Sequence, residues 1–144
     1  MCLQVSGASQ ANGSAVLQAP CGTGPSGYHQ QLSFEFADFH DGKYYYRHRF
    51  RHSDKCAQVV NASQSNGANL IQFTCGSGIS GYHQHWTSSG EQAEGVWHRH
   101  RVRHSGKCMN VPSLTSGEVV EQTTCGSGIT GYSQQWEIMR VDGT

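Results

Sequence analysis

Arginines alternate with other side chains in two similar segments, and guanidinium chemistry is the first chemistry that the sequence suggests. The segments read Arg47-His48-Arg49-Phe50-Arg51 and Arg99-His100-Arg101-Val102-Arg103. Guanidinium groups on one face of a strand can hold phosphate or sulfate bidentately. The segments therefore favour either a basic stripe that binds a sulfated glycan, or a solvated exterior on which each arginine covers apolar surface with its stem. Nucleic acid is the weaker candidate partner.

The chain contains nine histidines, which raises the question of a metal site. His98, His100 and His104 fall on one side of a segment with strand-like alternation. Zinc sites usually combine such residues with Cys or carboxylate ligands at characteristic spacings, and those spacings are missing. We expect no metal and no other cofactor, and we expect His100 and its counterpart His48 to face inward.

The sequence carries none of the common signatures of catalysis. Gly-x-Ser-x-Gly, His-Glu-x-x-His and a phosphate-binding glycine loop that leads into a helix are all absent. The ten Asp and Glu residues do not recur as a facing pair, because Glu121 and Glu137 have no counterparts elsewhere in the chain. We therefore expect a protein that binds and is not an enzyme.

A unit that occurs three times contains most of these residues. The copies begin with Cys2-Leu3-Gln4-Val5, Cys56-Ala57-Gln58-Val59 and Cys108-Met109-Asn110-Val111, and they close with Gly27-Tyr28-His29-Gln30-Gln31-Leu32, Gly81-Tyr82-His83-Gln84-His85-Trp86 and Gly131-Tyr132-Ser133-Gln134-Gln135-Trp136. We place the copies at about residues 1–43, 44–95 and 96–144 of a single domain and name them lobe 1, lobe 2 and lobe 3.

Each copy is predicted to form strands joined by turns. Tyr46, His48, Phe50 and His52 alternate with arginines, which is the period of a half-buried strand. Clusters of Gly, Ser and Asn separate such stretches, and no helical stripe exceeds one turn. Charged residues make up only 14% of the chain, against about 25% in typical soluble domains, but the zero net charge argues against disorder. The fold class is therefore all-β.

Six cysteines are distributed as two in each copy. Fifteen pairings are possible, but the repeat favours one disulfide within each copy: Cys2 with Cys21, Cys56 with Cys75 and Cys108 with Cys125. Each bridge would contribute roughly 3 kcal/mol in the chain-entropy model and would compensate for a small core. Disulfides indicate a secreted, extracellular protein. Reduced thiols are the alternative.

The repeat resembles the ricin B-type lectins. The resemblance rests on Ser53-Asp54-Lys55-Cys56 and Ser105-Gly106-Lys107-Cys108, on the second Cys of each copy, and on the Gln-x-Trp endings at Trp86 and Trp136. It implies a β-trefoil, in which three four-stranded units around a pseudo-threefold axis form a barrel of six strands capped by three hairpins. It also implies that the partners are glycans or glycoproteins. A protein-binding or sulfated-glycan-binding trefoil, acting as an inhibitor or scaffold, is the alternative.

The first unit lacks the strand that precedes Cys56 and Cys108 in the other two, since only Met1 stands before Cys2. A closed barrel without this strand would expose unpaired edges. The barrel could stay open, or residues outside the chain could fill the gap. We favour a third explanation, that part of the natural N-terminus has been lost.

The resemblance implies a shallow sugar pocket in each unit. In the family, an acidic residue two after the first Cys receives sugar hydroxyls, an aromatic residue two before the second Cys stacks on the ring, and a polar residue and a bracing Gln precede the Trp. The corresponding residues are Gln4, Ala19, His29 and Gln30 in lobe 1, Gln58, Phe73, His83 and Gln84 in lobe 2, and Asn110, Thr123, Ser133 and Gln134 in lobe 3. Amides replace the acid throughout, and only lobe 2 keeps the aromatic. Lobe 2 is therefore the predicted working site.

A tyrosine stands immediately before each predicted polar ligand residue: Tyr28, Tyr82 and Tyr132. These rings could supply the aromatic faces that lobes 1 and 3 lack. Alternatively, each ring covers the barrel edge or the disulfide. The resemblance also admits a catalytic or toxin domain elsewhere in a longer chain. No run approaches eighteen apolar residues, so we expect no membrane insertion.

Overall fold

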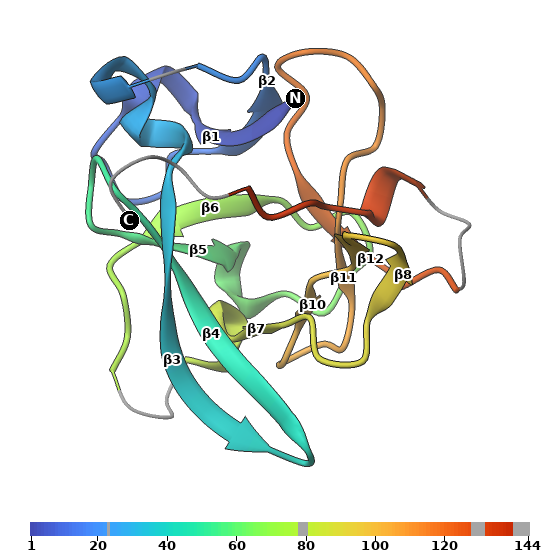
Figure 1. Cartoon of the computed structure of the whole chain (residues 1–144). Coiled ribbons are helices and arrows are strands. Elements are labelled where there is room, and N and C mark those ends of the chain that lie inside the picture. The colour runs from blue at the N-terminus through green and yellow to red at the C-terminus, as the bar shows by residue number, and fades with distance from the viewer. Residues whose placement is uncertain (23, 78–80, 128–131, 140–144) are drawn as a thin grey trace.

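The computed structural model describes residues 1–22, 24–77, 81–127 and 132–139, and in this part of the chain it confirms an all-β protein (Figure 1). The strands are β1 (Cys2–Val5), β2 (Val16–Ala19), β3 (Leu32–His40), β4 (Lys43–Phe50), β5 (Cys56–Val59), β6 (Leu70–Phe73), β7 (Trp86–Thr87), β8 (Gln92–Glu94), β9 (Trp97–His98), β10 (Arg101–Val102), β11 (Cys108–Asn110) and β12 (Glu121–Thr123). The helical elements are short 3₁₀ turns: η1 (Ser6–Ala8), η2 (Gly24–Gln30), η3 (Val60–Ala62), η4 (Tyr82–Gln84) and η5 (Tyr132–Gln134).

Three antiparallel hairpins, β1–β2, β5–β6 and β11–β12, occupy equivalent positions in the three lobes. Each is closed by a disulfide, and the pairing is the one expected from the repeat: Cys2–Cys21, Cys56–Cys75 and Cys108–Cys125. The first cysteine of each pair begins the first strand of its hairpin, and the second follows the end of the other strand. Each bridge therefore joins the start of the first strand to the end of the second strand, at the open end of the hairpin.

Glutamine side chains join neighbouring lobes in the same way three times. The amide of Gln72 donates to the carbonyl oxygens of Ser9 and Ala11, at 2.8 Å each. Gln122 makes the equivalent bonds to lobe 2, and Gln18 makes them to lobe 3. Since all three glutamines are buried, these bonds satisfy polar groups inside the molecule. Their repetition confirms the pseudo-threefold symmetry.

A longer sheet connects the lobes through the β3–β4 hairpin and through β7 and β10. The β3–β4 turn contains Asp41 and Gly42, both with positive φ, which suits the twist of a two-residue hairpin turn. Leu32 pairs with Phe50, and Trp86 pairs with Val102. These pairings join the end of one lobe to the first strand of the next. In lobe 1 the first strand described is β1, which begins at Cys2.

The core is small and draws on all three lobes. Its fully buried residues include Val5, Val16, Phe50, Val59, Leu70, Trp86, Val102 and Val120. Trp86 is a core anchor, and its indole N–H donates to the carbonyl of Ala57 at 3.1 Å. Trp136 and Leu32, at the equivalent positions of the other lobes, are only partly buried against the same core. The border between lobes 3 and 1, where Trp136 lies, is therefore less closed than the border between lobes 2 and 3, where Trp86 lies.

His48 and His100 face inward, as expected. They meet edge to face with ring centroids 5.4 Å apart, and His48 also stacks on Trp86. Burial lowers the pKa of His48 well below its usual value, and burial, followed by the charge of His98, lowers the pKa of His100 to about 4. Both rings are therefore neutral core residues at pH 7. Within the described ranges, no three His, Cys, Asp or Glu side chains form a group that could hold a metal ion.

Candidate functional site

The sugar position predicted for lobe 2 lies on the β5–β6 hairpin. Cys56 pairs with Phe73, and Gln58 pairs with Ile71. Residues two apart along a strand share a face, so Gln58 and Phe73 lie on the same face of the hairpin. Phe73 is 40% exposed, whereas Gln58 is buried. The lobe thus presents an accessible ring beside a nearly covered amide.

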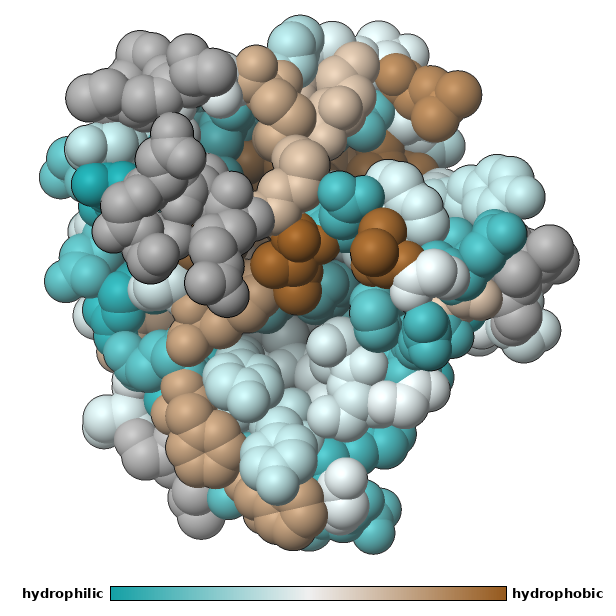
Figure 2. All heavy atoms as spheres, in the orientation of Figure 1, coloured by the Kyte–Doolittle hydropathy of each residue, from teal (hydrophilic) through white to brown (hydrophobic). Residues whose placement is uncertain are grey.

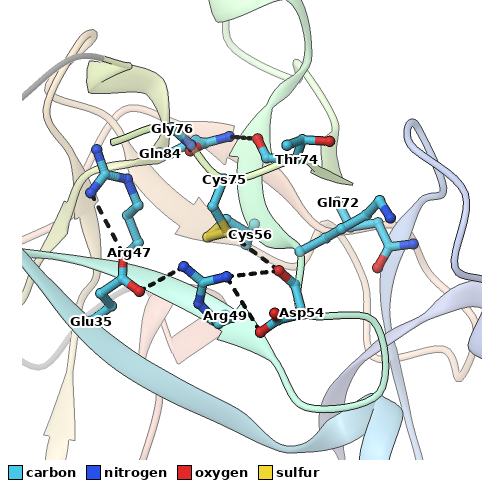
Figure 3. Close-up of a disulfide and its surroundings, with 12 residues drawn as sticks. Glu35, Arg47, Arg49, Asp54, Cys56, Gln72, Thr74, Cys75, Gly76 and Gln84 are labelled. Carbon is cyan, nitrogen blue, oxygen red and sulfur yellow. Dashed lines mark hydrogen bonds and ion pairs between the residues drawn. A yellow bond between two sulfur atoms is a disulfide. The ribbon is translucent and has the colours of Figure 1, made fainter. Parts of the chain in front are cut away.

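Gln84 in η4 connects this hairpin to the segment that follows Cys75. Its amide nitrogen donates to Gln58 Oε1 at 2.8 Å and to the carbonyl of Thr74 at 3.0 Å. Its oxygen accepts the backbone N–H of Gly76 at 2.8 Å (Figure 3). Gln84 is buried, so these bonds are shielded from water. The bracing role predicted for this glutamine is thus supported by three hydrogen bonds.

Lobe 1 repeats the brace but lacks the ring. Gln30 donates to Gln4 Oε1 and to the carbonyl of Pro20, both at 2.8 Å, and accepts from the N–H of Gly22. Ala19, where lobe 2 has Phe73, is buried and offers no stacking surface. The amide pair is therefore retained in lobe 1 without an aromatic at the expected position.

In lobe 3 both polar atoms of the predicted ligand side chain, Asn110, already form hydrogen bonds within the protein. Asn110 donates to Glu121 Oε2 at 3.0 Å and accepts from the hydroxyl of Ser133 at 2.8 Å. Gln134 still braces the loop, with bonds to the carbonyl of Thr124 and from the N–H of Gly126. Because these side chains satisfy one another, lobe 3 offers fewer polar groups to a sugar than lobe 2.

His83 occupies the polar ligand position of lobe 2. It is half-buried and meets His104 edge to face at 6.3 Å, as His29 meets His52 in lobe 1. Burial, and secondarily the charge of His104, lowers the pKa of His83. The ring is therefore neutral at pH 7 and carries one donor and one acceptor, a combination that suits a sugar hydroxyl.

The tyrosines of lobes 1 and 2 each have an arginine on one face. The guanidinium carbon of Arg103 lies 3.9 Å from the ring centroid of Tyr82, and that of Arg51 lies 3.7 Å from the centroid of Tyr28. Tyr82 also lies 5.4 Å from the ring of His85. These contacts support the alternative in which the tyrosine covers the barrel edge. Tyr132 differs, since it is 71% exposed.

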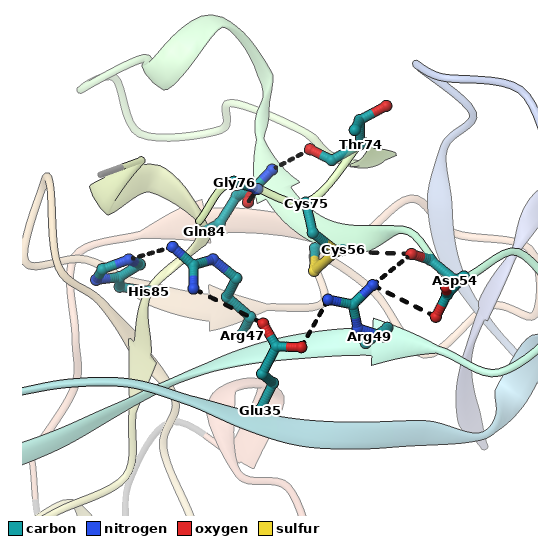
Figure 4. Close-up of polar contacts among 10 residues, drawn as sticks. All are labelled: Glu35, Arg47, Arg49, Asp54, Cys56, Thr74, Cys75, Gly76, Gln84 and His85. Carbon is teal, nitrogen blue, oxygen red and sulfur yellow. Dashed lines mark hydrogen bonds and ion pairs between the residues drawn. A yellow bond between two sulfur atoms is a disulfide. The ribbon is translucent and has the colours of Figure 1, made fainter. Parts of the chain in front are cut away.

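Five of the six alternating arginines are buried or ion-paired, whereas Arg51 is exposed and stacks on Tyr28, so the six do not form a continuous exposed basic stripe. Glu35 lies 2.6 Å from Arg49 and 3.8 Å from Arg47, and Arg49 also lies 3.3 Å from Asp54 (Figure 4). Arg47 is only 2% exposed and lies 3.2 Å from His85 Nε2. Arg99 is buried, and Arg101 and Arg103 form ion pairs with Glu91 and Asp38. A sulfated partner would have to compete with these carboxylates.

An aromatic surface on the β3–β4 hairpin was missed by the sequence analysis. Its exposed rings belong to Phe34, Phe36, Phe39 and Tyr44. Phe39 and Tyr44 pack at 4.7 Å, and Phe36 lies near Tyr44 at 6.4 Å. Apolar side chains are visible along this projecting hairpin in Figure 2. The alternation in Phe34-x-Phe36 was the available signal, but sequence alone did not show that the hairpin extends beyond the core.

The described residues contain no helix with the length and apolar character needed to cross a membrane. The family model for the ricin-type β-trefoil lectin domain matches residues 1–136. A search of curated proteins finds no match.

Solved structures with a similar fold include a designed threefold-symmetric protein, ThreeFoil. It is 33% identical with a TM-score of 0.78, and the alignment covers 96% of this chain and 90% of that one. An exo-β-1,3-galactanase from Clostridium thermocellum is 26% identical with a TM-score of 0.74, over 94% of this chain and 26% of the galactanase. A Polyporus squamosus lectin is 15% identical with a TM-score of 0.69, and the alignment covers 93% of this chain and 42% of the lectin. This similarity shows a shared fold.

Proposed function

The chain belongs to the ricin-type β-trefoil lectin family, and we propose that it binds glycans through lobe 2 without catalysing a reaction. The observation that carries this proposal is the exposed ring of Phe73 on the same face as Gln58. A pyranose has one apolar face that stacks on an aromatic ring, and its hydroxyls need donors and acceptors beside that ring. Neutral His83 is the candidate donor or acceptor.

Binding by a single pocket is expected to be weak. A monosaccharide has few heavy atoms, and ligand efficiencies of roughly 0.3–0.4 kcal/mol per atom give a Kd near the millimolar range. Gln58 lacks the negative charge that strengthens acceptance of hydroxyl hydrogens. A glycan that engages more than one molecule at a surface would bind more tightly through avidity. Polymers and glycoproteins are therefore better candidate partners than free sugars.

We place the protein outside the cell and treat residues 1–144 as one domain. The three disulfides support an oxidising compartment. The core shared by all lobes supports a single domain with lobes divided near residues 43 and 95. The galactanase aligns with this chain over only 26% of its own length, which supports the idea that such a domain accompanies a catalytic or toxin domain in a longer protein.

The proposal is tested on a glycan array, followed by titration of the best glycan into Phe73→Ala. Loss of the stacking ring should weaken binding about tenfold or more while the melting temperature stays within a few degrees. Phe39→Ala is the matched control, because Phe39 is also an exposed ring but lies on the β3–β4 hairpin. Equal binding by Phe73→Ala and the wild type would refute the lobe 2 site.

Protein binding is a second candidate, and the aromatic surface of Phe34, Phe36, Phe39 and Tyr44 favours it. Clustered exposed apolar side chains commonly mark interaction surfaces. A blank glycan array, together with tight binding of a protein partner that Phe36→Ser abolishes, would support this function over lectin activity.

A further inference from the structure

The side chain of Arg103 in lobe 3 lies in a slot formed by Tyr45 and Tyr82 of lobe 2 and Asp38 of lobe 1. Its guanidinium carbon lies 3.9 Å from the ring centroid of Tyr82 and 5.1 Å from that of Tyr45, and Nη1 lies 2.8 Å from Asp38 Oδ2. Its backbone N–H donates to the carbonyl of His85 at 2.9 Å. Two aromatic faces, one carboxylate and one strand edge thus hold this arginine.

Arg51 makes part of the same set of contacts between lobes 1 and 2. Its guanidinium stacks on Tyr28 at 3.7 Å, and Nη1 donates to Gln31 Oε1 at 2.8 Å. Its backbone N–H donates to the carbonyl of Gln31, also at 2.8 Å. The stacked tyrosine and the backbone bond therefore occur twice, at positions related by the repeat, whereas the second ring and the carboxylate are described only around Arg103.

A third slot has the same walls. Glu94 pairs with Trp97 as Asp38 pairs with Tyr45, and the bridge between His98 and Trp136 corresponds to the bridge between Tyr46 and Trp86. The side chains that correspond to the walls of the Arg103 slot are Glu94, Trp97, Tyr132 and Gln135. These four residues line a pocket of about 310 Å³.

The rings of this third slot are more exposed than their counterparts. Trp97 is 43% exposed, against 8% for Tyr45, and Tyr132 is 71% exposed, against 41% for Tyr82. Among the residues that the structure describes, no guanidinium stacks on Tyr132. The walls of an arginine slot are therefore present in the described residues without a guanidinium stacked on Tyr132.

We propose that the pocket of Glu94, Trp97, Tyr132 and Gln135 is a docking site for an extended peptide that carries an arginine. The peptide adds as a strand beside Trp136, and its guanidinium lies against Trp97 and Tyr132 with Glu94 as its counter-ion. Cation–π contact and a charge-assisted ion pair favour a planar guanidinium over the ammonium of lysine. An uncharged sugar would hydrogen-bond to Glu94 but would not form this ion pair.

The two filled slots also define the sequence that the site should accept. An apolar residue precedes each arginine, Phe50 before Arg51 and Val102 before Arg103, and it is fully buried beside the partner strand. The same place beside Trp136 would bury an apolar side chain of the peptide. Main-chain pairing then sets the register, and the pocket selects arginine at the next position.

Residues after the arginine should contribute as well. His104 Nε2 lies 2.6 Å from the carbonyl oxygen of Ser63, and the hydroxyl of Ser105 donates to Gln122 Oε1 at 2.8 Å. His52 and Ser53 make the same two contacts in the preceding lobe. At the third border the corresponding groups are the carbonyl of Ser113 and the side chain of Gln18, which hydrogen-bond to each other. The preferred peptide is therefore apolar-Arg-His-Ser.

The test uses a synthetic peptide that copies Arg99–Lys107, titrated into the intact protein by calorimetry. We expect one peptide per chain. The peptide with Arg103→Ala should bind about tenfold more weakly, and the peptide with Arg103→Lys should also lose affinity. In the protein, Glu94→Gln and Tyr132→Ala should each weaken binding several-fold, whereas the matched controls Asp41→Asn and Phe39→Ala should not. All four replaced side chains are exposed, so the variants should fold.

Three results would overturn the proposal. These are no binding at about millimolar peptide, equal binding of the arginine and alanine peptides, and a sugar that perturbs the nuclear magnetic resonance signals of Trp97 and Tyr132 while the peptide does not. Phe73→Ala should leave peptide affinity unchanged, so this test is independent of the lobe 2 glycan site.

Discussion

Gln84 donates a hydrogen bond to the side-chain oxygen of Gln58 at 2.8 Å, and this bond joins the Gln-x-Trp segment to strand β5. Both side chains are buried. The residue at the expected sugar-acid position is thus held by the residue that braces the following loop. In lobe 2, the geometry of the proposed glycan site and the stability of the hairpin therefore depend on the same amide pair.

Replacing Gln84 with alanine should destabilise the protein. The change removes three hydrogen bonds and leaves the N–H of Gly76 and the oxygen of Gln58 without this partner, so a loss of about 2–3 kcal/mol is expected. Urea unfolding of the variant and the wild type measures this loss of free energy of unfolding. Gln64→Ala is the control, because Gln64 is exposed and its amide donates a hydrogen bond to the carbonyl of His104. Equal losses in the two variants would contradict the bracing role.

Tyr82→Ala should leave glycan affinity nearly unchanged, because one face of Tyr82 is already covered by Arg103. The loss of the cation–π contact should instead cost about 0.5–2 kcal/mol of stability. Titration of the glycan identified on the array and thermal unfolding measure the two effects. A tenfold loss of glycan affinity with unchanged stability would show that Tyr82 contacts the sugar.

Acid should destabilise the fold through its core histidines. His100 has a pKa of about 4 in the folded chain, against 6.5 for an exposed histidine, and the pKa of His48 is also lowered. Between pH 6.5 and about 4 the unfolded chain therefore binds protons that the folded chain does not. The stability contributed by neutral His100 is complete above pH 6.5 and falls as the pH drops toward 4.

His100→Phe should reduce this acid sensitivity. The free energy of unfolding of the wild type should be about 2–3 kcal/mol lower at pH 4.5 than at pH 7.5 because of His100. The variant should not show this part of the decrease. Urea unfolding of both proteins at the two pH values measures the difference, and carboxylate effects cancel in the comparison. His100→Gln serves as a second variant if phenylalanine does not fit. Parallel pH profiles for wild type and variants would contradict the assignment.

Removing the Cys56–Cys75 bridge by Cys56→Ala/Cys75→Ala should lower stability by roughly 3 kcal/mol, because the bridge closes the β5–β6 hairpin. Glycan binding by lobe 2 should weaken at the same time, since Phe73 lies within this hairpin. The matched control is Cys2→Ala/Cys21→Ala, which opens the equivalent bridge of lobe 1. It should lower stability similarly and spare the glycan affinity. Melting curves and glycan titrations of both variants test this difference.

The repeat predicted the fold class, the three bridges and the inward-facing His48 and His100. These features follow from local spacing that is copied along the chain, because equivalent segments of a repeat take equivalent places around a shared core. The glycan-binding residues Gln58, Phe73 and His83 stay a prediction until binding is measured.

The remaining features depended on which distant side chains meet. Spacing did not show that Arg103 stacks on Tyr82, that Glu35 pairs with Arg49, or that Gln18 bonds across to lobe 3. Each of these contacts joins segments whose separation is set by the closure of the barrel and by the twist of its strands. Charge pairing, ring exposure and the third arginine slot were therefore decided by tertiary structure, because they depend on distances in space that residue order does not encode directly.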